Sequence, residues 1–476
     1  MKITIIGIDG LEKNIIDQYI DQLPNFKNIS DNGTLSKIQT VFPADSVPAW
    51  NTIFTGLDPS EHGIVRGKDY VESLQDYENN STFKLEGKTF WDAISKQNKK
   101  VLVLNPYLAY PPWKIDGVFV SGPAFVKGET IAYPEHHIIN NPGIFGGYEP
   151  ISNQSLVTNI ALAQDHTTLL KEELKTQLGK DNYDLVFCTF TTLDRIQHYT
   201  WRYHDQSDPL HEKHPILSNS IFETIKILDN LIGDTITAMK GDDSLIIISD
   251  HGFAQRPYKL INLNEVLRRE ALLLINKKDD GIMSLIINKI RNISIKVLSK
   301  LKLLDIIALK VKGMNSLNKF KKSSFMIDRI NSKYFTDDYF NGKKPYCGIN
   351  VGKSHGINLT DESRGEFIIE LMGIFKKYDL PTPLWMRWND ELYEGKYASN
   401  YPDICFELPS EYGIEYDLYG EIITRSVTHY KISGGHLSAG TFGFFSKDGS
   451  KRTLTSIKEF HKFILSLSRN ENPISK

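Results

Sequence analysis

Short runs of apolar residues recur along the chain, each bounded by polar residues or by glycine and proline. Almost every position within a run is apolar, which is typical of strands buried on both faces of a sheet. The runs lie at residues 3–8, 100–105, 184–190 and 244–249. We therefore predict that these four segments are neighbouring strands of one sheet.

Between these runs the apolar positions recur at helical spacing. Helices are expected at residues 11–30, 88–99, 167–179 and 219–241. Strands that alternate with helices are what βαβ units require. The pattern predicts an α/β fold with a mostly parallel central sheet and helices on both faces.

The segment 260–350 interrupts this alternation. Within it, residues 284–323 contain ten lysine and arginine residues but one acid, Asp305. We predict an inserted basic helical lobe over 260–350, with the α/β core formed by residues 1–260 and 350–476. The basic residues form either a solvated helix face or a functional surface, and the sequence leaves both open.

Composition narrows the class of protein. The 476 residues are 40% hydrophobic and 24% charged with a net charge of -2, so we expect a globular protein without the basic footprint of a general nucleic-acid binder. The three cysteines, Cys188, Cys347 and Cys405, favour neither a disulfide framework nor a thiolate zinc site. No apolar run suits a signal peptide or a membrane span, so we predict a cytoplasmic protein without a transmembrane segment.

Polar residues with ligand chemistry follow the predicted strands directly. Because the carboxyl ends of parallel strands meet at one edge of a sheet, these residues are expected to meet there. They are Asp9 after 3–8, Asp194 and His198 after 184–190, and Asp250 and His251 after 244–249, with His436 on a later loop behind a Gly-Gly pair.

The residue types in this set are those of a metal centre. Asp194 and His198 are four residues apart and share one helix face, although such a pair is commonly only solvated. Three neutral imidazoles and three carboxylates suit zinc, and two ions would use all of them. The combination predicts a centre for two divalent cations.

Ser46 lies between Pro43 and Pro48, ahead of an apolar segment that predicts a helix over 48–56. Serine is among the commonest helix N-caps, so a capping role explains this residue by itself. The local stretch does not decide between a cap and a nucleophile.

These features together resemble the alkaline phosphatase superfamily, in its type I phosphodiesterase/nucleotide pyrophosphatase branch. The matching elements are Asp9, "FPADSVPAWNTIFTGLDPSEHGI" (42–64), "LDRIQHY" (193–199), "SDHG" (249–252) and "GGH" (434–436). The resemblance implies Ser46 as nucleophile, one cation on Asp194, His198 and His436, and another on Asp9, Asp250, His251 and Ser46. Zn²⁺ is the expected ion and Mn²⁺ the alternative.

The resemblance also implies the reaction. Ser46, positioned at the cap of a helix whose N-terminus attracts anions, would attack phosphorus, and water would then hydrolyse the covalent intermediate. The implied partner is a small-molecule phosphate ester, with diesters and pyrophosphates favoured. Phosphomonoesterase, phosphonate hydrolase, phosphotransferase and non-catalytic binding module remain alternatives.

The stretch "HGIVRGKDY" departs from this branch. Relatives usually carry an asparagine here that donates to a phosphoryl oxygen, whereas this chain has Gly67, flanked by Arg66 and Lys68. These three residues are the candidate substrate-binding positions. The 105–123 segment, with its aromatic residues, and the basic lobe are further candidates for selecting the substrate. His62 and the remaining histidines are assigned no metal role.

Overall fold

The computed structural model describes residues 1–75, 84–150, 154–180, 183–276, 290, 327–340, 343–356 and 359–469. The chain divides into two compact units. The first comprises residues 1–207, 211–254 and 436–476, and the second comprises 208–210 and 255–435. Each unit is described separately below.

A sheet of eight strands forms the centre of the first unit, in the order β2-β17-β7-β1-β6-β3-β4-β5. The inner strands β7, β1, β6, β3 and β4 run parallel, and β2, β17 and β5 complete the sheet through antiparallel pairs. Their bounds are β1 Ile3–Ile8, β2 Thr34–Gln39, β3 Val101–Leu104, β4 Gly117–Ser121, β5 Ile131–Tyr133, β6 Leu185–Phe190, β7 Ser244–Ile248 and β17 Ala439–Ser446. The four predicted strands are confirmed as β1, β3, β6 and β7.

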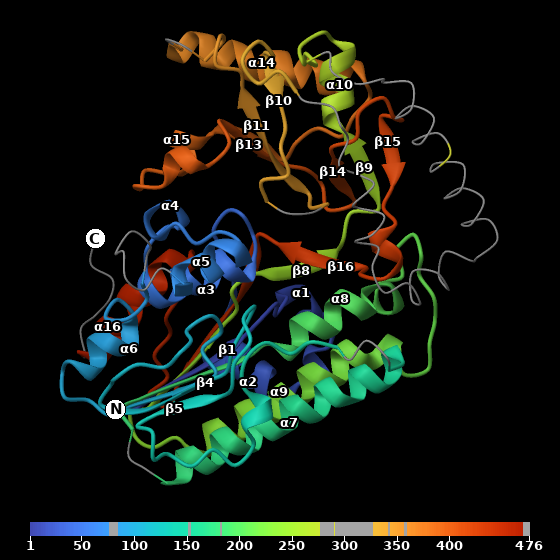
Figure 1. Ribbon diagram of the computed structural model, residues 1–476. Helices are drawn as coiled ribbons and strands as arrows, with labels where there is room; N and C mark the ends of the chain where they lie inside the picture. Colours follow the sequence, from blue (N-terminus) through green and yellow to red (C-terminus); the bar gives the residue numbers. More distant parts are fainter. Residues whose placement is uncertain are drawn as a thin grey trace. The chain divides into compact units, whose positions relative to one another are not determined.

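Helices cover both faces of this sheet (Figure 1), as predicted. One face packs against α1 Lys13–Gln18, α2 Pro24–Asn32, α7 Leu156–Lys180, α8 Thr192–His204 and α9 Ser220–Ala238. The other packs against α3 Ser46–Thr55, α6 Phe90–Ser95 and α16 Phe460–Ser468. The shorter helices α4 Pro59–His62 and α5 Gly67–Gln75 follow α3.

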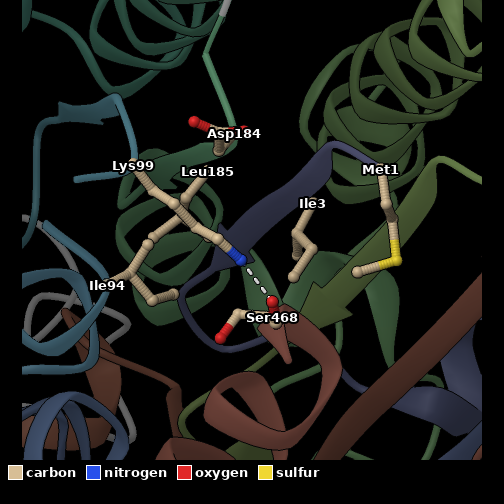
Figure 2. A pocket seen from close by; sticks show the side chains of 7 residues that line it. All are labelled: Met1, Ile3, Ile94, Lys99, Asp184, Leu185 and Ser468. Atoms are coloured by element: carbon tan, nitrogen blue, oxygen red, sulfur yellow. Dashed lines mark hydrogen bonds between the residues drawn. The ribbon is translucent and has the colours of Figure 1, made fainter. Parts of the chain in front are cut away.

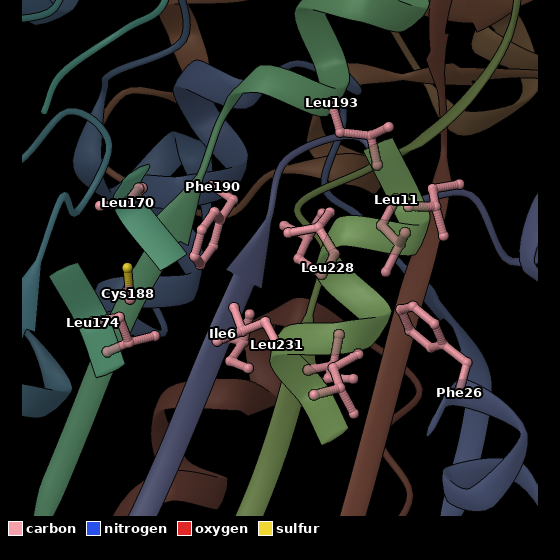
Figure 3. Packing of buried hydrophobic residues seen from close by; sticks show 14 of the residues in the cluster. Ile6, Leu11, Phe26, Leu170, Leu174, Cys188, Phe190, Leu193, Leu228 and Leu231 are labelled. Carbon is pink, nitrogen blue, oxygen red and sulfur yellow. The ribbon is translucent and has the colours of Figure 1, made fainter. Parts of the chain in front are cut away.

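Successive residues of the central strands enter different cores. In β1, Ile6 and Ile8 belong to the cluster that includes Leu170 and Leu228 (Figure 3), whereas Ile3 and Ile5 point to the opposite cluster. This alternation follows from the period of two along a strand. It explains why the predicted strands contain almost no polar residues.

The helix expected over 11–30 is interrupted. The structure has α1, a short 3-10 turn at Ile20–Gln22 and then α2, which begins at Pro24. Proline lacks the N–H that a helix interior requires but is well tolerated in the first turn, so Pro24 starts a second helix.

The second unit contains two further sheets, ordered β10-β11-β13-β12 and β14-β9-β15. Its elements are β9 Lys259–Asn262, α10 Leu263–Arg269, β10 Tyr334–Phe335, β11 Tyr346–Val351, α14 Asp361–Lys377, β12 Trp385–Trp388, α15 Asn389–Leu392, β13 Ile404–Glu407, β14 Tyr412–Glu415 and β15 Ile423–Arg425. The chain passes between the units at β8 Gly252–Gln255 and β16 Gly434–Leu437.

The second unit extends past the predicted lobe to Gly435, because the strands after residue 350 pair with those before it. The basic stretch 284–323 lies outside the described residues except for Ile290. Its role as a helical lobe stays a prediction. Among the described residues, no helix is long and apolar enough to cross a membrane.

Candidate active site

The candidate ligands meet at the carboxyl end of the parallel strands. Asp9 follows β1, Asp194 lies in the first turn of α8 behind β6, and Asp250 and His251 follow β7. Because β1 lies between β6 and β7, these three strand ends are neighbours in space. His436, in β16, joins them from late in the chain.

One group of side chains surrounds the Ser46 hydroxyl. Ser46 Oγ lies 3.3 Å from Asp9 Oδ1 and 3.1 Å from His251 Nε2. His251 Nε2 is also 3.3 Å from Asp250 Oδ2 and 3.6 Å from Asp9 Oδ1. A single cation could therefore contact oxygen and nitrogen ligands from all four residues.

A second group lies beside the first. Asp194 Oδ1 is 3.4 Å from His198 Nε2 and 3.3 Å from His436 Nε2, and these two nitrogens are 3.1 Å apart. Ligand atoms of Asp194, His251 and His436 also lie within 4.8 Å of one another, as do those of Asp9, Asp250 and His251. His251 thus lies at the boundary of the two groups, and its ring stacks on that of His436 with centroids 3.8 Å apart.

Backbone carbonyls select the tautomer of two imidazoles. His251 Nδ1 lies 3.0 Å from the Gly252 carbonyl and His436 Nδ1 lies 3.1 Å from the Ala44 carbonyl. A carbonyl only accepts, so Nδ1 carries the proton in each ring and donates it. Nε2 then presents its lone pair to the site, which is the arrangement of metal-binding histidines.

Burial and mutual repulsion shift the pKa values of these groups. Burial raises the pKa of Asp9 and of Asp250, and the Asp194 carboxylate raises both further. Burial opposes ionisation of Asp194 too, but His198 and His436 outweigh it and lower the pKa of this carboxyl. Burial, reinforced by His436, lowers the pKa of His251 and keeps this imidazole neutral.

The residues fit a pair of divalent cations on two observations. Asp194 Oδ1 and Asp250 Oδ2 are buried and accept no hydrogen bond from any residue that the structure describes. Buried carboxylate oxygens without donors are costly unless a cation compensates them. The donor set of carboxylates and neutral imidazoles suits Zn²⁺ or Mn²⁺.

The N-terminus of α3 differs from the sequence interpretation. Asp45, in extended conformation, caps the helix by accepting from the Val47 N–H at 3.3 Å, and Ser46 is the first helical residue. The prediction that Ser46 occupies the cap is therefore wrong. Aspartate caps helices as well as serine does, and its capping role leaves the Ser46 hydroxyl directed at Asp9 and His251.

Trp50 has a role that its apolar spacing did not indicate. Its Nε1 donates to Asp9 Oδ2 at 3.1 Å, which orients that carboxylate. The ring fits because residue 7 of β1 is glycine: a Cβ at Gly7 would lie 2.8 Å from the Trp50 ring. From the sequence, Asp9 as a candidate metal ligand is expected to accept a hydrogen bond that orients it. Only the fold shows that Trp50 is the donor.

Gly7→Ala is expected to destabilise the first unit by about 1–3 kcal/mol, because the fully buried Trp50 has no free space to move into. Denaturant unfolding measures this change. Gly143→Ala is the matched control, since a Cβ there meets nothing within 4 Å, and its effect should stay within about 0.5 kcal/mol. Equal stability of the two variants would contradict the close packing of Trp50 on β1.

The three candidate substrate-binding positions have other neighbours. Arg66 forms a forked ion pair with Asp69, with its Nη2 2.7 Å from Oδ1. Lys68 is largely exposed and lies 3.4 Å from Glu72. A Cβ at Gly67 would meet the ring of Phe125 at 3.2 Å. Arg66 and Lys68 are thus paired with acidic residues of α5, and their role in substrate binding stays a prediction.

Two further features lie apart from the ligand groups. His62 accepts from the Ile64 N–H at 3.0 Å, and burial lowers its pKa to about 3, which suits a packing role.

A cavity of about 200 Å³ opens where β1 and β6 begin, between Ile3, Leu185 and Lys99 (Figure 2). Ligand sites of parallel sheets lie at the opposite, carboxyl ends of the strands.

A mostly parallel sheet covered on both faces, with carboxylates and imidazoles clustered beyond its carboxyl edge, is the arrangement that the resemblance to the alkaline phosphatase superfamily implies. The family model of type I phosphodiesterase / nucleotide pyrophosphatase matches residues 3–323, and the chain belongs to this family. The chain is also similar to phosphonoacetate hydrolase from Sinorhizobium meliloti 1021, in its structure with phosphonoformate. The two chains align over 98% of this chain and 96% of the hydrolase, with 12% sequence identity and a TM-score of 0.51. That likeness extends to the fold alone.

Curated relatives match part of the chain. Ectonucleotide pyrophosphatase/phosphodiesterase family member 1 of Homo sapiens is 23% identical over 270 residues, and that of Rattus norvegicus is 21% identical over 271 residues. Each match covers 55% of this chain and 25% of the relative's length. The chain therefore corresponds to a minor part of these longer proteins.

Proposed function

We propose that the protein is a metal-dependent phosphoric ester hydrolase of the phosphodiesterase/nucleotide pyrophosphatase type, with Ser46 as its nucleophile. The observation that carries this proposal is the Ser46 hydroxyl, held within 3.3 Å of both Asp9 and His251 beside buried carboxylate oxygens that accept no hydrogen bond among the described residues. A structural serine would not need so many cation ligands around it.

Two divalent cations are proposed, Zn²⁺ first and Mn²⁺ second. One would be held by Asp194, His198 and His436, and the other by Asp9, Asp250, His251 and Ser46. When bound, such ions lower the pKa of a coordinated hydroxyl group and neutralise charge on phosphoryl oxygens. Trp50 holds Asp9 in orientation, and the carbonyls of Gly252 and Ala44 bind Nδ1 of His251 and His436, which directs Nε2 of each ring at the site.

The chain's own residues then perform two displacements. Ser46 Oγ gives up its proton to solvent and forms a bond to phosphorus while the bond from phosphorus to the ester oxygen breaks, and the leaving group departs with that electron pair and takes up a proton. A water oxygen next attacks phosphorus as the bond from phosphorus to Ser46 Oγ breaks, and a proton lost by this water returns to the serine oxygen. The N-terminus of α3 directs the positive end of its helix dipole toward the phosphoryl oxygens, because Ser46 is its first residue.

Diesters and pyrophosphates are the proposed substrate class. The names of the family and of the curated relatives support this class. Phosphomonoesters, phosphonates and phosphotransfer remain the competing chemistries, as does binding without catalysis. Cytoplasmic location stays a prediction; the described cysteines Cys188, Cys347 and Cys405 are free and buried, which is consistent with it.

A substrate panel tests the reaction. Aryl phosphodiester, monoester, sulfate and phosphonate are offered to the protein loaded with Zn²⁺ or Mn²⁺, and we expect the largest kcat/KM for the diester. Gly67→Asn is a second arm, since an amide donor to a phosphoryl oxygen is expected to raise kcat/KM about tenfold if the exposed Phe125 ring moves aside. A diester-to-monoester ratio well below one would overturn the diester assignment.

A further inference from the structure

Arg195 is the residue after Asp194, and sequence analysis assigned it no role. Its side chain is only 25% exposed. Nε lies 3.9 Å from Asp194 Oδ2, on the oxygen opposite the one that faces His198 and His436. The guanidinium therefore stands beside a candidate metal ligand, separated from the imidazoles by one carboxylate group.

The guanidinium of Arg195 makes only long ion pairs within the part of the chain that the structure describes. Its contacts are ion pairs, to Asp194 at 3.9 Å and to Glu149 Oε1 at 3.4 Å, and it donates no hydrogen bond there. By contrast, Arg66 and Arg268 each make forked hydrogen bonds to a carboxylate. A mostly buried guanidinium that donates no hydrogen bond to these residues can still donate to a carboxylate or phosphate anion.

The position of Arg195 is fixed by rigid elements. Gln197, on the same turn of α8, donates from Nε2 to the Gly10 carbonyl at 2.7 Å, which ties the helix to the end of β1. Asn105 bonds the Thr189 carbonyl and the Gly146 N–H, at 2.8 and 2.6 Å, and so holds the loop that carries Glu149 beside α8. The backbone that carries Arg195 is therefore tied to the strand ends that carry Asp9 and Asp194.

Electrostatics agree with this placement. An arginine side chain stays positively charged in proteins, and the charge of Arg195 lies beside the carboxylates of Asp194 and Glu149. Glu149 is 71% exposed, so water screens its pairing with Arg195.

We propose that Arg195 is a substrate-binding residue whose guanidinium donates to a non-bridging oxygen of the phosphoryl group. The proposal rests on the proposed function for the identity of the anion. It assigns to α8 the donor that is missing at Gly67, and it supplies a positive charge that a neutral amide would not. The alternative is a purely structural role, in which Arg195 only holds the loop that carries Glu149 through their ion pair.

Three variants separate these roles: Arg195→Gln, Arg195→Lys and Glu149→Gln. Each is loaded with Zn²⁺, checked for zinc content and thermal unfolding, and titrated calorimetrically with inorganic phosphate. kcat and KM for an aryl phosphodiester are measured on the same samples. Phosphate binding needs no turnover, so it reports on Arg195 even if the proposed hydrolysis is wrong.

We expect Arg195→Gln to weaken phosphate binding about tenfold or more and to lower kcat/KM roughly 100-fold at unchanged zinc content. Arg195→Lys should recover part of both, because it keeps the charge without the fork. Glu149→Gln should leave both within about twofold. Unchanged phosphate affinity in Arg195→Gln, equal losses in Glu149→Gln, or no phosphate binding by the wild type would each overturn the proposal. If the variants change phosphate affinity as expected but the wild type hydrolyses no ester, the proposed function is wrong and the role of Arg195 in binding stands.

Discussion

Replacing Ser46 with alanine is expected to lower kcat at least about 10³-fold, because the hydroxyl that forms the bond to phosphorus is gone. The fold should survive, since Asp45 and not Ser46 caps α3 and its hydrogen bond to Val47 is untouched. Zinc content should also stay close to that of the wild type, because Asp9, Asp250 and His251 remain. Steady-state kinetics and elemental analysis on one preparation measure both quantities.

Ser46→Thr is the matched control for this variant. It keeps a hydroxyl group at the same position, so it is expected to retain most of the turnover that alanine loses. A Ser46→Ala protein that hydrolyses diesters at a rate near the wild type would mean that water attacks phosphorus directly. The covalent step would then be wrong even if the metal centre is correct.

Removal of divalent cations is expected to abolish hydrolysis and to lower the melting temperature. A ligand that binds the native state at a thousand times its Kd stabilises it by about 4 kcal/mol. Protons compete for the oxygens of Asp9 and Asp250, whose pKa values are raised, so stabilisation by added Zn²⁺ should grow as the pH rises. Calorimetric scans of chelated and refilled protein at two pH values test this, and full activity of metal-free protein would contradict it.

In the metal-free protein, stability is expected to change with pH in the opposite direction, and Asp250→Asn tests this. The raised pKa of Asp250 means that the folded state keeps this proton to a higher pH than the unfolded state, so the wild type loses stability as the pH rises. Asparagine removes that loss and can still accept from the Gly10 N–H, as Asp250 Oδ1 does at 3.2 Å. The variant should therefore be more stable than the wild type without metal at high pH, yet inactive with it. Lower stability under those conditions would contradict the cost of ionising Asp250, which comes first from its burial and then from the Asp194 carboxylate.

The strands, and the meeting of the polar residues that follow them, were predictable because local pattern determines both. β1, β3, β6 and β7 are almost wholly apolar, and parallel pairing brings the residues that follow them to one edge. The break at Pro24 and the cap at Asp45 needed backbone geometry, since two adjacent capping residues compete at 45 and 46. Edge strand β5 is too short to show a period.

Other site features depend on contacts that no local pattern encodes. Trp50 reads as a core residue from its spacing, and only the β1–α3 packing shows that its N–H reaches Asp9. Arg66 reads as a free cation near Gly67, but Asp69 occupies its fork. Nothing in the sequence distinguishes Arg195 from a solvated arginine beside Asp194. Only the structure shows that its side chain is mostly buried and makes long ion pairs to Asp194 and Glu149.

The stereochemical course at phosphorus tests the central claim most directly. Hydrolysis of a P-chiral phosphorothioate diester in ¹⁸O-labelled water, by the protein loaded with Zn²⁺, distinguishes two displacements from one. Because each in-line displacement inverts phosphorus, attack by Ser46 followed by attack by water predicts net retention of configuration. Net inversion would show a single displacement by water and would contradict Ser46 as the nucleophile.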